Sequence, residues 1–292
     1  MEKDILQIFN NLMAIHEENF LDGVVGEERI RLLEKHVMDV FQGVYTGGEA
    51  ISQPDLYQIP MKIQKAIELY SSSDFTKING FLRQHQGYVK GTGEKVKEFD
   101  LVTFEDKEYD LDGVIDSLDY VIDKFKSDKD FIFFRGCDIA QFQDFGVSSS
   151  EELDSFVGKS FVEHSFLSTT SALGGQFTIS SPIVLAIHVP EGSCFLPMDS
   201  QLALKGEKEV LLERETRLSV GGVEKIGDQY FVYMQSSPME KTIVQDMDSI
   251  HLTSNDDSLS LSKSYDDDYD SDLSIMLDDM DIVEDSQPKK NK

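Results

Sequence analysis

The sequence predicts an α+β protein in which helices come first along the chain and strands follow. Up to about residue 129, apolar residues recur at spacings of three and four, which is typical of amphipathic helices. After Lys129 the pattern changes to short runs rich in β-branched and aromatic residues, separated by Gly, Ser, Pro and Asp clusters, which indicate strands. This order favours an α+β domain over a βαβ repeat. A doubly wound fold is further disfavoured because no Gly-x-Gly-x-x-Gly motif follows a strand.

Helical spacing is found in two stretches within residues 1–50, in a segment that starts near Pro60, and in residues 75–83 and 111–125. Pro60 is expected at a helix start, where a missing backbone N–H costs nothing. The segment from Leu111 to Phe125 is the clearest helix, because its apolar stripe is continuous. Residues 1–53 carry no chemical motif, so we expect them to serve packing or partner docking.

Short β-branched and aromatic runs predict five strands in the second half of the chain, at residues 131–134, 183–189, 209–212, 217–220 and 229–234. Residues 247–292 are expected to form an acidic tail. From Ser254 onward this tail has few large apolar groups, so burial cannot offset the entropy lost on ordering, and we expect disorder. Within it, residues 273–283 have the spacing of a short amphipathic helix that would form on a partner.

The chain is strongly acidic, with a formal net charge of −28 over 292 residues. Such a surface repels nucleic-acid backbones and anionic membranes, so we expect no direct contact with either. The two cysteines, Cys137 and Cys194, match no metal spacing, which favours a reducing compartment over a disulfide scaffold. The N-terminal residues lack the apolar run of a signal peptide, and no apolar run is long enough to span a bilayer. The expected place of action is the cytosol.

The segment FIFFRGCD places Arg135 at the end of an apolar strand with Gly136 directly after it. An arginine there can bind a phosphate through its planar guanidinium group. The glycine lets a flat ring lie against the backbone, because it has no Cβ atom. A strand followed by Arg-Gly also occurs by chance, so this motif alone is weak.

Two further segments carry polar groups at strand edges. In SFLSTT, the hydroxyl of Ser168 can fix a neighbouring carboxylate, although strand ends are often satisfied by Ser and Thr for purely structural reasons. In GEKEVLL, Glu207 and Glu209 are two residues apart, so on a strand both carboxylates face one side. One can stabilise an oxocarbenium-like sugar centre and the other can accept a proton from a nucleophile. A solvated edge strand is the structural alternative.

The three segments follow one another in the order Arg, Ser-Thr, Glu-x-Glu. This arrangement resembles the Arg–Ser–Glu class of ADP-ribosyltransferases, which contains the clostridial binary toxin enzymes and related phage enzymes. The resemblance covers residues 55–246 or so, and includes Tyr70 and the pair Ile78–Asn79 in the helical part. It implies a mainly antiparallel two-sheet β core with an NAD cleft. We therefore expect a catalytic domain at residues 54–246, between the N-terminal segment and the tail.

The resemblance also implies an activity and the roles of individual residues. The chain would be a mono-ADP-ribosyltransferase that uses NAD as co-substrate, releases nicotinamide and needs no metal. Arg135 would bind an NAD phosphate, and the backbone of Gly136 would contact the nicotinamide amide. Ser168 would position the carboxylate of Glu209, which would be the catalytic glutamate and would bind the ribose 2′-hydroxyl.

Glu207 would face the acceptor. In this family a glutamate at that position goes with arginine acceptors, whereas a glutamine goes with others, asparagine among them. The chemistry agrees, because a guanidinium group is protonated near neutral pH and is a poor nucleophile until a base removes a proton. The expected partner is therefore a protein with an accessible arginine.

Other expected cofactor-binding residues lie in the helical part and in the loop after the Ser-Thr-Thr segment. Tyr70 and Asn79 would line the NAD site from the helical side. Phe177 would stack on nicotinamide, although it could equally be an aromatic residue of the core. The sequence departs from the family pattern at Thr170, where serine is commoner, and before Pro182, where the second phosphate-binding arginine of some relatives has no counterpart.

Two other functions stay open on the sequence. The chain could be predominantly an NAD glycohydrolase with water as acceptor, or a non-catalytic acidic interaction protein that retains the fold. The six histidines show no ligand-like spacing, so no metal site is expected. Cys137 lies close to Gly136 but is expected to be a small buried side chain rather than a nucleophile. The resemblance favours a bacterial effector or phage enzyme that is delivered by a phage or by a specialised secretion route.

Overall fold

A computed structural model describes residues 3–15, 20–21, 23–42, 44, 51, 59–72, 75–84, 101–104, 107–143, 147–198 and 208–238. The chain divides into two units, residues 1–255 and 256–292, and all the described residues belong to the first. The predicted acidic tail with its segment 273–283 lies outside the described residues, as does Glu207. The domain boundaries at residues 54 and 246 remain predictions.

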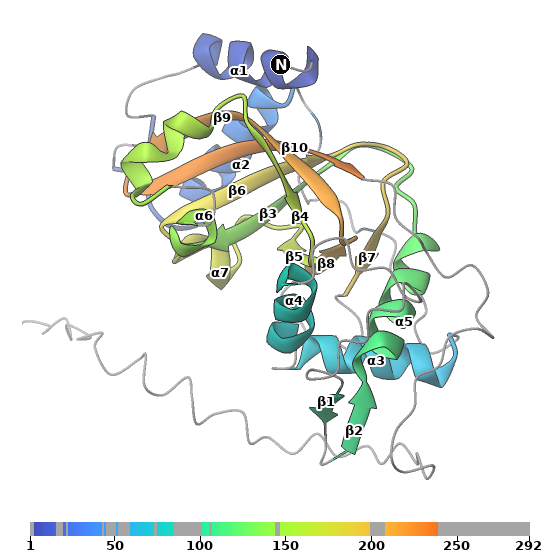
Figure 1. Cartoon of the computed structure of the whole chain (residues 1–292). Coiled ribbons are helices and arrows are strands. Elements are labelled where there is room, and N and C mark those ends of the chain that lie inside the picture. The colour runs from blue at the N-terminus through green and yellow to red at the C-terminus, as the bar shows by residue number, and fades with distance from the viewer. Residues whose placement is uncertain are drawn as a thin grey trace, which may run out of the picture. The chain divides into compact units, whose positions relative to one another are not determined.

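The described chain contains helices mainly in its first half and strands mainly in its second, which confirms the predicted α+β class (Figure 1). The helices are α1 (Lys3–Ile15), α2 (Gly26–Val40), α3 (Met61–Ser71), α4 (Phe75–Gln84), α5 (Leu111–Asp123), the short α6 (Ala140–Gln143) and α7 (Gln176–Ile179), and the 3-10 helix η2 (Ser150–Phe156). The strands are β1 (Leu101–Phe104), β2 (Lys107–Asp110), β3 (Phe131–Cys137), β4 (Ser160–Glu163), β5 (Leu167–Thr170), β6 (Ile183–Val189), β7 (Phe195–Pro197), β8 (Glu209–Leu212), β9 (Thr216–Ile226) and β10 (Gln229–Pro238).

Eight strands are hydrogen-bonded in the order β4-β9-β10-β6-β3-β5-β8-β7, and β1 and β2 form a separate pair. Only β6 and β10 run parallel among the described strand pairs, so the core is mainly antiparallel, as predicted. The contact between β3 and β5 is a single pair, Phe134 with Thr170. The eight strands therefore consist of a five-stranded part and a three-stranded part that meet at one narrow junction.

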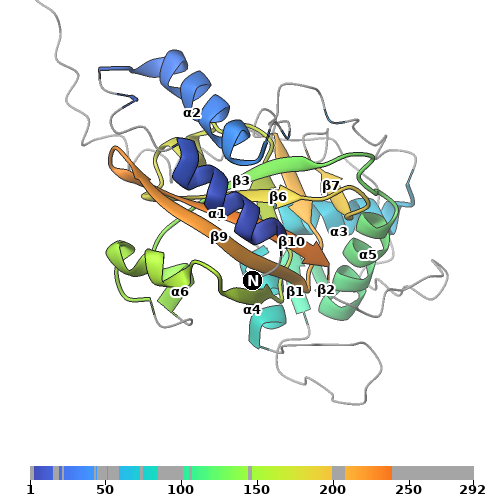
Figure 2. The same cartoon turned by 90° about the horizontal axis from the view of Figure 1, so that it is seen from above.

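Helices α1 and α2 lie over one face of the five-stranded part, as Figure 2 shows from above. Two glycines of β9 allow α1 to approach closely. A Cβ atom on Gly221 would lie 2.7 Å from Cγ2 of Ile8, and one on Gly222 would lie 2.7 Å from Cδ2 of Leu12. Because heavy atoms cannot approach this closely, larger residues there would push the helix away.

Helix α2 is attached to the same face by apolar and polar contacts. Its Val37 is fully buried in the cluster that contains Phe134 and Tyr233. Nε2 of the buried His36 lies 2.7 Å from Oε2 of Glu224, and the hydroxyl of Tyr233 donates to that same oxygen at 3.1 Å. The N-terminal segment thus packs against the sheet and completes its core.

Helices α3, α4 and α5 lie next to the three-stranded part (Figure 1). They form a second apolar cluster with residues of that part, including Leu196 of β7 and Leu211 of β8. Helix α5 begins where predicted, because the side chain of Asp110 accepts a hydrogen bond from the Gly113 backbone at 3.3 Å and caps the helix. Helix α3 begins directly after Pro60, also as predicted. In the described part of the chain, no helix has the length and apolar character needed to cross a membrane.

Candidate active site

The two central polar groups come from neighbouring strands β5 and β8. Exposure alternates along β5, with Leu167 and Thr169 buried and Ser168 and Thr170 half-buried, so the last two share one face. Thr170 is paired with Glu209 across the two strands, which places the glutamate on that same face. The Ser168 hydroxyl donates to Oε1 of Glu209 at 2.6 Å.

Arg135 lies on β3, beyond the four buried residues that the sequence identifies as a strand. Its Nη1 donates to the backbone oxygen of Ser168 at 2.6 Å, and its Nε donates to the Gln141 side chain at 3.5 Å. Gly136 follows directly and is half-buried. The three predicted groups, a guanidinium, a hydroxyl and a carboxylate, are therefore connected through Ser168.

Two predicted residues approach this face from the helical side. Nδ2 of Asn79 donates to the Tyr70 hydroxyl at 3.0 Å, and that hydroxyl donates to the backbone oxygen of Phe166 at 3.3 Å. Burial raises the pKa of Tyr70, the Asn79 hydrogen bond opposes this, and the charges of Glu209 and Arg135 then act in opposite directions. Tyr70 thus lies within electrostatic reach of both strand residues.

The Oδ1 atom of Asn79 is buried and has no hydrogen-bond partner in the described part of the molecule. An unpaired buried acceptor is costly, so it indicates a place for a donor from a ligand or a water molecule. The other predicted site residues are described incompletely. Phe177 lies in α7, but its side chain is outside the described residues, as is all of Glu207.

The sequence analysis did not identify Gln141, which contacts Arg135 from α6, or the role of Lys208. Helix α6 carries no motif, so nothing in the sequence indicates that its glutamine faces the arginine. Lys208 directly precedes Glu209, has a positive φ of 49°, and accepts a hydrogen bond from the Ser171 backbone at 3.0 Å. This bond extends the pairing of β5 and β8 by one step beyond Glu209.

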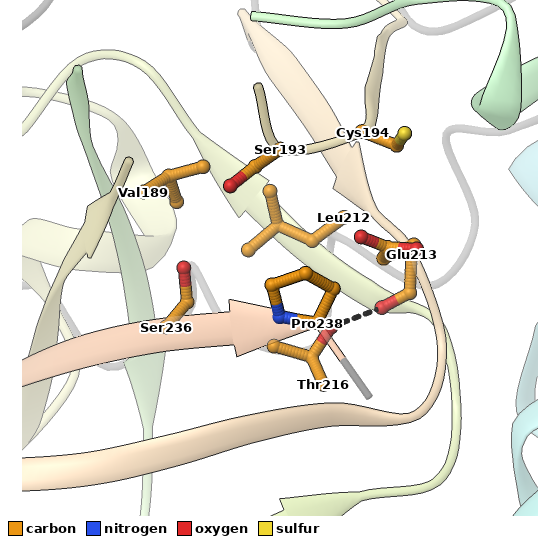
Figure 3. Close-up of a pocket in the computed structure, with 8 residues that line it drawn as sticks. All are labelled: Val189, Ser193, Cys194, Leu212, Glu213, Thr216, Ser236 and Pro238. Atoms are coloured by element: carbon orange, nitrogen blue, oxygen red, sulfur yellow. Dashed lines mark hydrogen bonds between the residues drawn. The ribbon is translucent and has the colours of Figure 1, made fainter. Parts of the chain in front are cut away.

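The structure contains a cavity of about 10 Å³, whose lining side chains are drawn in Figure 3. It is lined by Val189, Ser193, Cys194, Leu212, Glu213, Thr216, Ser236 and Pro238. This volume suits a single water molecule, which the buried and unpaired Oγ of Ser193 would bind. The cavity contains none of the predicted site residues and is far too small for a dinucleotide. Within the residues described, no group of three or more His, Cys, Asp or Glu side chains is arranged to hold a metal ion.

The fold is similar to that of bacterial ADP-ribosylating exoenzymes of known structure. C3stau2 from S. aureus, solved with NAD, matches with a TM-score of 0.50 and 20% identity over 62% of this chain and 89% of that one. The Clostridium limosum C3 exoenzyme matches with a TM-score of 0.50 and 21% identity over 62% of this chain and 87% of that one. At these identities the likeness defines the fold, which is that of an ADP-ribosyltransferase.

The sequence itself matches the model of the ADP-ribosyltransferase exoenzyme family over residues 54–250. The chain therefore belongs to that family, and the resemblance seen in its motifs is confirmed. No curated protein matches the sequence significantly. Membership makes the chain an ADP-ribosyltransferase of the toxin type.

Proposed function

We propose that this chain transfers ADP-ribose from NAD to arginine side chains of a target protein and releases nicotinamide. The hydrogen bond of 2.6 Å from Ser168 to Glu209 carries the NAD-cleavage part of this proposal, because it holds a carboxylate in one orientation. The backbone oxygen of the same serine accepts a hydrogen bond from the Arg135 guanidinium group. A fixed negative charge stabilises a positively charged ribosyl centre in the transition state, since it needs no reorganisation during the reaction.

Arg135 is proposed to bind a phosphate of NAD. A guanidinium group has five N–H donors, and the contacts with Ser168 and Gln141 use two of them. The remaining donors suit a phosphate, which arginine binds with two parallel hydrogen bonds. We assign the backbone of Gly136, beside it, to the nicotinamide amide.

Tyr70, Asn79 and Phe177 are proposed to complete the NAD site. The unpaired Oδ1 of Asn79 suits a donor group of the dinucleotide, and the bond to Tyr70 fixes its orientation. Phe177 is assigned to stacking on nicotinamide. The use of NAD is supported by family membership and by the S. aureus relative, whose structure contains NAD.

Glu207 is proposed to activate the acceptor. It precedes Glu209 by two residues, and a carboxylate is the type of group that can remove a proton from an arginine guanidinium. Arginine specificity rests on this residue type and on the family pattern. Because acceptor activation and NAD cleavage use different carboxylates, they are separable by mutation.

The experiment is incubation of the purified chain with labelled NAD and with bacterial and eukaryotic lysates, followed by mass-spectrometric mapping of modified residues. We expect discrete proteins modified on arginine. Glu209→Gln should lower both nicotinamide release and transfer by about 10²–10³-fold, as for loss of a transition-state contact. Glu207→Gln should abolish transfer and keep NAD hydrolysis, and the exposed control Glu191→Gln should change neither.

Each alternative outcome has a definite meaning. Equal loss of both activities in Glu207→Gln would overturn the division of roles, and modification of other residue types would overturn arginine specificity. Free ADP-ribose in large excess over protein-bound ADP-ribose would make the chain predominantly an NAD glycohydrolase. Undetectable NAD binding by calorimetry would favour a non-catalytic interaction protein. We also propose that the chain acts in the cytosol of a target cell after delivery by a phage or by secretion.

A further inference from the structure

Asn79 and Arg83 lie on the same face of α4, because they are four residues apart on a helix. Asn79 is proposed above to bind NAD through its unpaired Oδ1 atom. Arg83 is one helical turn further along, so a contact that holds its guanidinium group also fixes the direction in which this face of α4 points. The placement of Asn79 therefore depends on the partner of Arg83.

The partner of Arg83 is Glu163, the last residue of β4. Nε of the arginine donates to Oε1 of the glutamate at 3.1 Å, and Nη2 donates to Oε2 at 3.2 Å. Two parallel bonds fix the relative orientation of a guanidinium group and a carboxylate, which a single bond does not. The glutamate side chain is only 16% exposed, whereas that of the arginine is 48% exposed. The pair thus joins α4 to a well-enclosed group at the end of β4.

Glu163 also binds the link between β4 and β5, which consists of residues 164–166. Its Oε1 atom accepts the backbone N–H of Ser165 at 2.9 Å and the Ser165 hydroxyl at 2.6 Å. Ser165 is completely buried, and the next residue, Phe166, is the one whose backbone oxygen accepts the Tyr70 hydroxyl. One carboxylate therefore contacts both α4 and the link to which α3 is bonded.

Together these contacts form a closed circuit around α3, α4 and the link. Hydrogen bonds connect the side chains, and the backbone of α4 and of the link completes the circuit. Because each member is held on two sides, none can move without breaking a bond elsewhere, which restricts rotation of α4 more than one isolated bond does. In order, the members are Asn79, Tyr70, Phe166, Ser165, Glu163 and Arg83.

The link is attached to the sheet independently of Glu163. Nδ1 of His164 lies 3.0 Å from Oε2 of Glu215, in the turn between β8 and β9, and β4 is paired with β9. Loss of the bonds to Arg83 should therefore release α4 and not the link, which leads directly into β5, the strand of Ser168. We expect such a loss to affect NAD binding more than NAD cleavage.

We propose that Glu163 is a positioning residue for NAD binding, which places Asn79 by holding Arg83 and the β4–β5 link together. The proposal deepens the proposed function and rests on it, because it uses the NAD site assigned there. Glu163 acts through α4 and contacts neither NAD nor the acceptor. Its substitution should consequently change the affinity for NAD and leave the cleavage step nearly unaffected.

The test compares Glu163→Gln with wild type. The glutamine side chain can still accept both hydrogen bonds from Ser165, but it then presents an N–H group to Arg83, so the two parallel bonds are lost. We expect Kd for NAD by calorimetry and KM for NAD to rise about fivefold to tenfold, with kcat for nicotinamide release within about twofold of wild type.

Glu68→Gln is the matched control for this substitution. Glu68 pairs with Lys65 at 3.0 Å and its side chain is 12% exposed, so its burial resembles that of Glu163, but both partners belong to α3. The control removes a similar ion pair from the same helical part without detaching a helix from a strand. It should match wild type in Kd, KM and kcat, even where its unfolding midpoint falls as much as that of Glu163→Gln.

A double-mutant cycle with Asn79→Ala tests the route of the effect. If Glu163 acts by placing Asn79, Glu163→Gln should raise Kd by less than about twofold when Asn79 is already replaced. A role in stability alone predicts the same rise in both backgrounds. Ser165→Ala removes one donor to the carboxylate and keeps the backbone N–H, so Kd should rise about threefold. This variant tests the proposal independently if Glu163→Gln does not fold.

Three results would overturn the positioning role: an unchanged Kd in Glu163→Gln, additive effects with Asn79→Ala, or a lower Kd. The last would mean that Glu163 withholds Arg83 from the dinucleotide. If the wild-type chain binds no NAD, the proposed function fails and the positioning role with it. If the wild type modifies arginine and Glu163→Gln matches it in Kd, the proposed function stands and only the positioning role is wrong. If NAD binds without transfer, the transfer function fails, and Kd still decides the role of Glu163.

Discussion

Oγ of Ser168 lies 2.6 Å from Oε1 of Glu209, across two adjacent antiparallel strands. The pair is diagonal, because Glu209 is opposite Thr170 in the register and the serine is two residues away on the same face. Diagonal neighbours come within reach when one side chain is long, as glutamate is. The position of the hydroxyl thus follows from the strand register, which also defines how the carboxylate is oriented.

Removal of this hydroxyl should affect turnover more than folding. In Ser168→Ala the carboxylate loses its donor and can rotate, so we expect kcat for nicotinamide release to fall roughly tenfold to a hundredfold. The measurement is steady-state nicotinamide release. Ser160→Ala is the control, because it breaks another strand–strand contact, 2.7 Å from Ser219, away from the site. Equal kcat in the two variants would contradict the role of Ser168.

A buried ion pair joins α5 to the turn after β8. Arg214 donates from Nε to Oδ2 of Asp119 at 2.8 Å, and both side chains are almost completely buried. Asp119→Ala leaves a buried guanidinium group without this carboxylate, so we expect the free energy of unfolding to fall by about 3–5 kcal/mol. Urea denaturation measures this change.

The matched control for this ion pair is the exposed pair of Glu28 and Arg31, whose closest atoms are also only 2.6 Å apart. Glu28→Ala should leave the urea midpoint unchanged, because solvent screens exposed charges. If both substitutions lowered the free energy of unfolding strongly, the loss of stability would depend on charge rather than on burial.

The two glycines under α1 should differ in their tolerance of a methyl group. In Gly221→Ala the new Cβ meets Cγ2 and Cβ of Ile8 at 2.7 and 2.8 Å, so the helix itself must move. We expect a loss of about 1–3 kcal/mol in unfolding free energy. In Gly222→Ala the close atom is Cδ2 of Leu12, the end of a flexible side chain, and the loss should be smaller. Thermal or urea unfolding measures both losses. A larger loss in Gly222→Ala than in Gly221→Ala would contradict the described packing.

The Cys137 thiol should titrate only at high pH. Burial raises its pKa to about 12, and the positive charge of Arg135 opposes this only partly. A raised pKa means that the folded state retains a proton that the unfolded state loses. Cys137 therefore contributes stability that is complete below about pH 9, the ordinary thiol range, and is lost as the pH rises toward 12.

The corresponding measurement is urea unfolding of the wild type and Cys137→Ala between pH 8 and pH 11 or so. The wild type should lose more stability over this window than the variant does. Alkylation provides a second check, because a buried neutral thiol reacts slowly. Native protein at pH 8 should resist iodoacetamide, and rapid modification of Cys137 under these conditions would contradict its assignment as an inert buried side chain.

The sequence predicted those elements whose apolar pattern is dictated by burial. Helix α5 has a continuous apolar stripe, and β6 is an uninterrupted apolar run that begins at Ile183 and ends at Val189, as expected. Strands β1, β2, β4, β5 and β7 were not predicted. Of these, β4 is at a sheet edge and has little burial to pattern it, and β7 has three residues, too few to show any period.

The site was predictable at the level of residue types and less so at the level of contacts. The spacing in the Glu-x-Glu segment indicated that both carboxylates face one side, and SFLSTT offered a hydroxyl that can fix a carboxylate. The structure brings Ser168 and Glu209 together. The hydrogen bond from the Tyr70 hydroxyl to the backbone oxygen of Phe166 joins residues 96 positions apart in the chain. A local pattern contains no information on such a pairing, because it depends on how α3 packs against the strands.

The single residue pair between β3 and β5 has a mechanical consequence. Arg135 belongs to the larger group of strands, whereas Ser168 and Glu209 belong to the smaller one, so the border between the two groups runs through the reactive centre. Near the site, the hydrogen bond from Arg135 to the backbone oxygen of Ser168 also crosses this border. A bound dinucleotide that contacts both Arg135 and Glu209 would therefore bridge the two groups of strands.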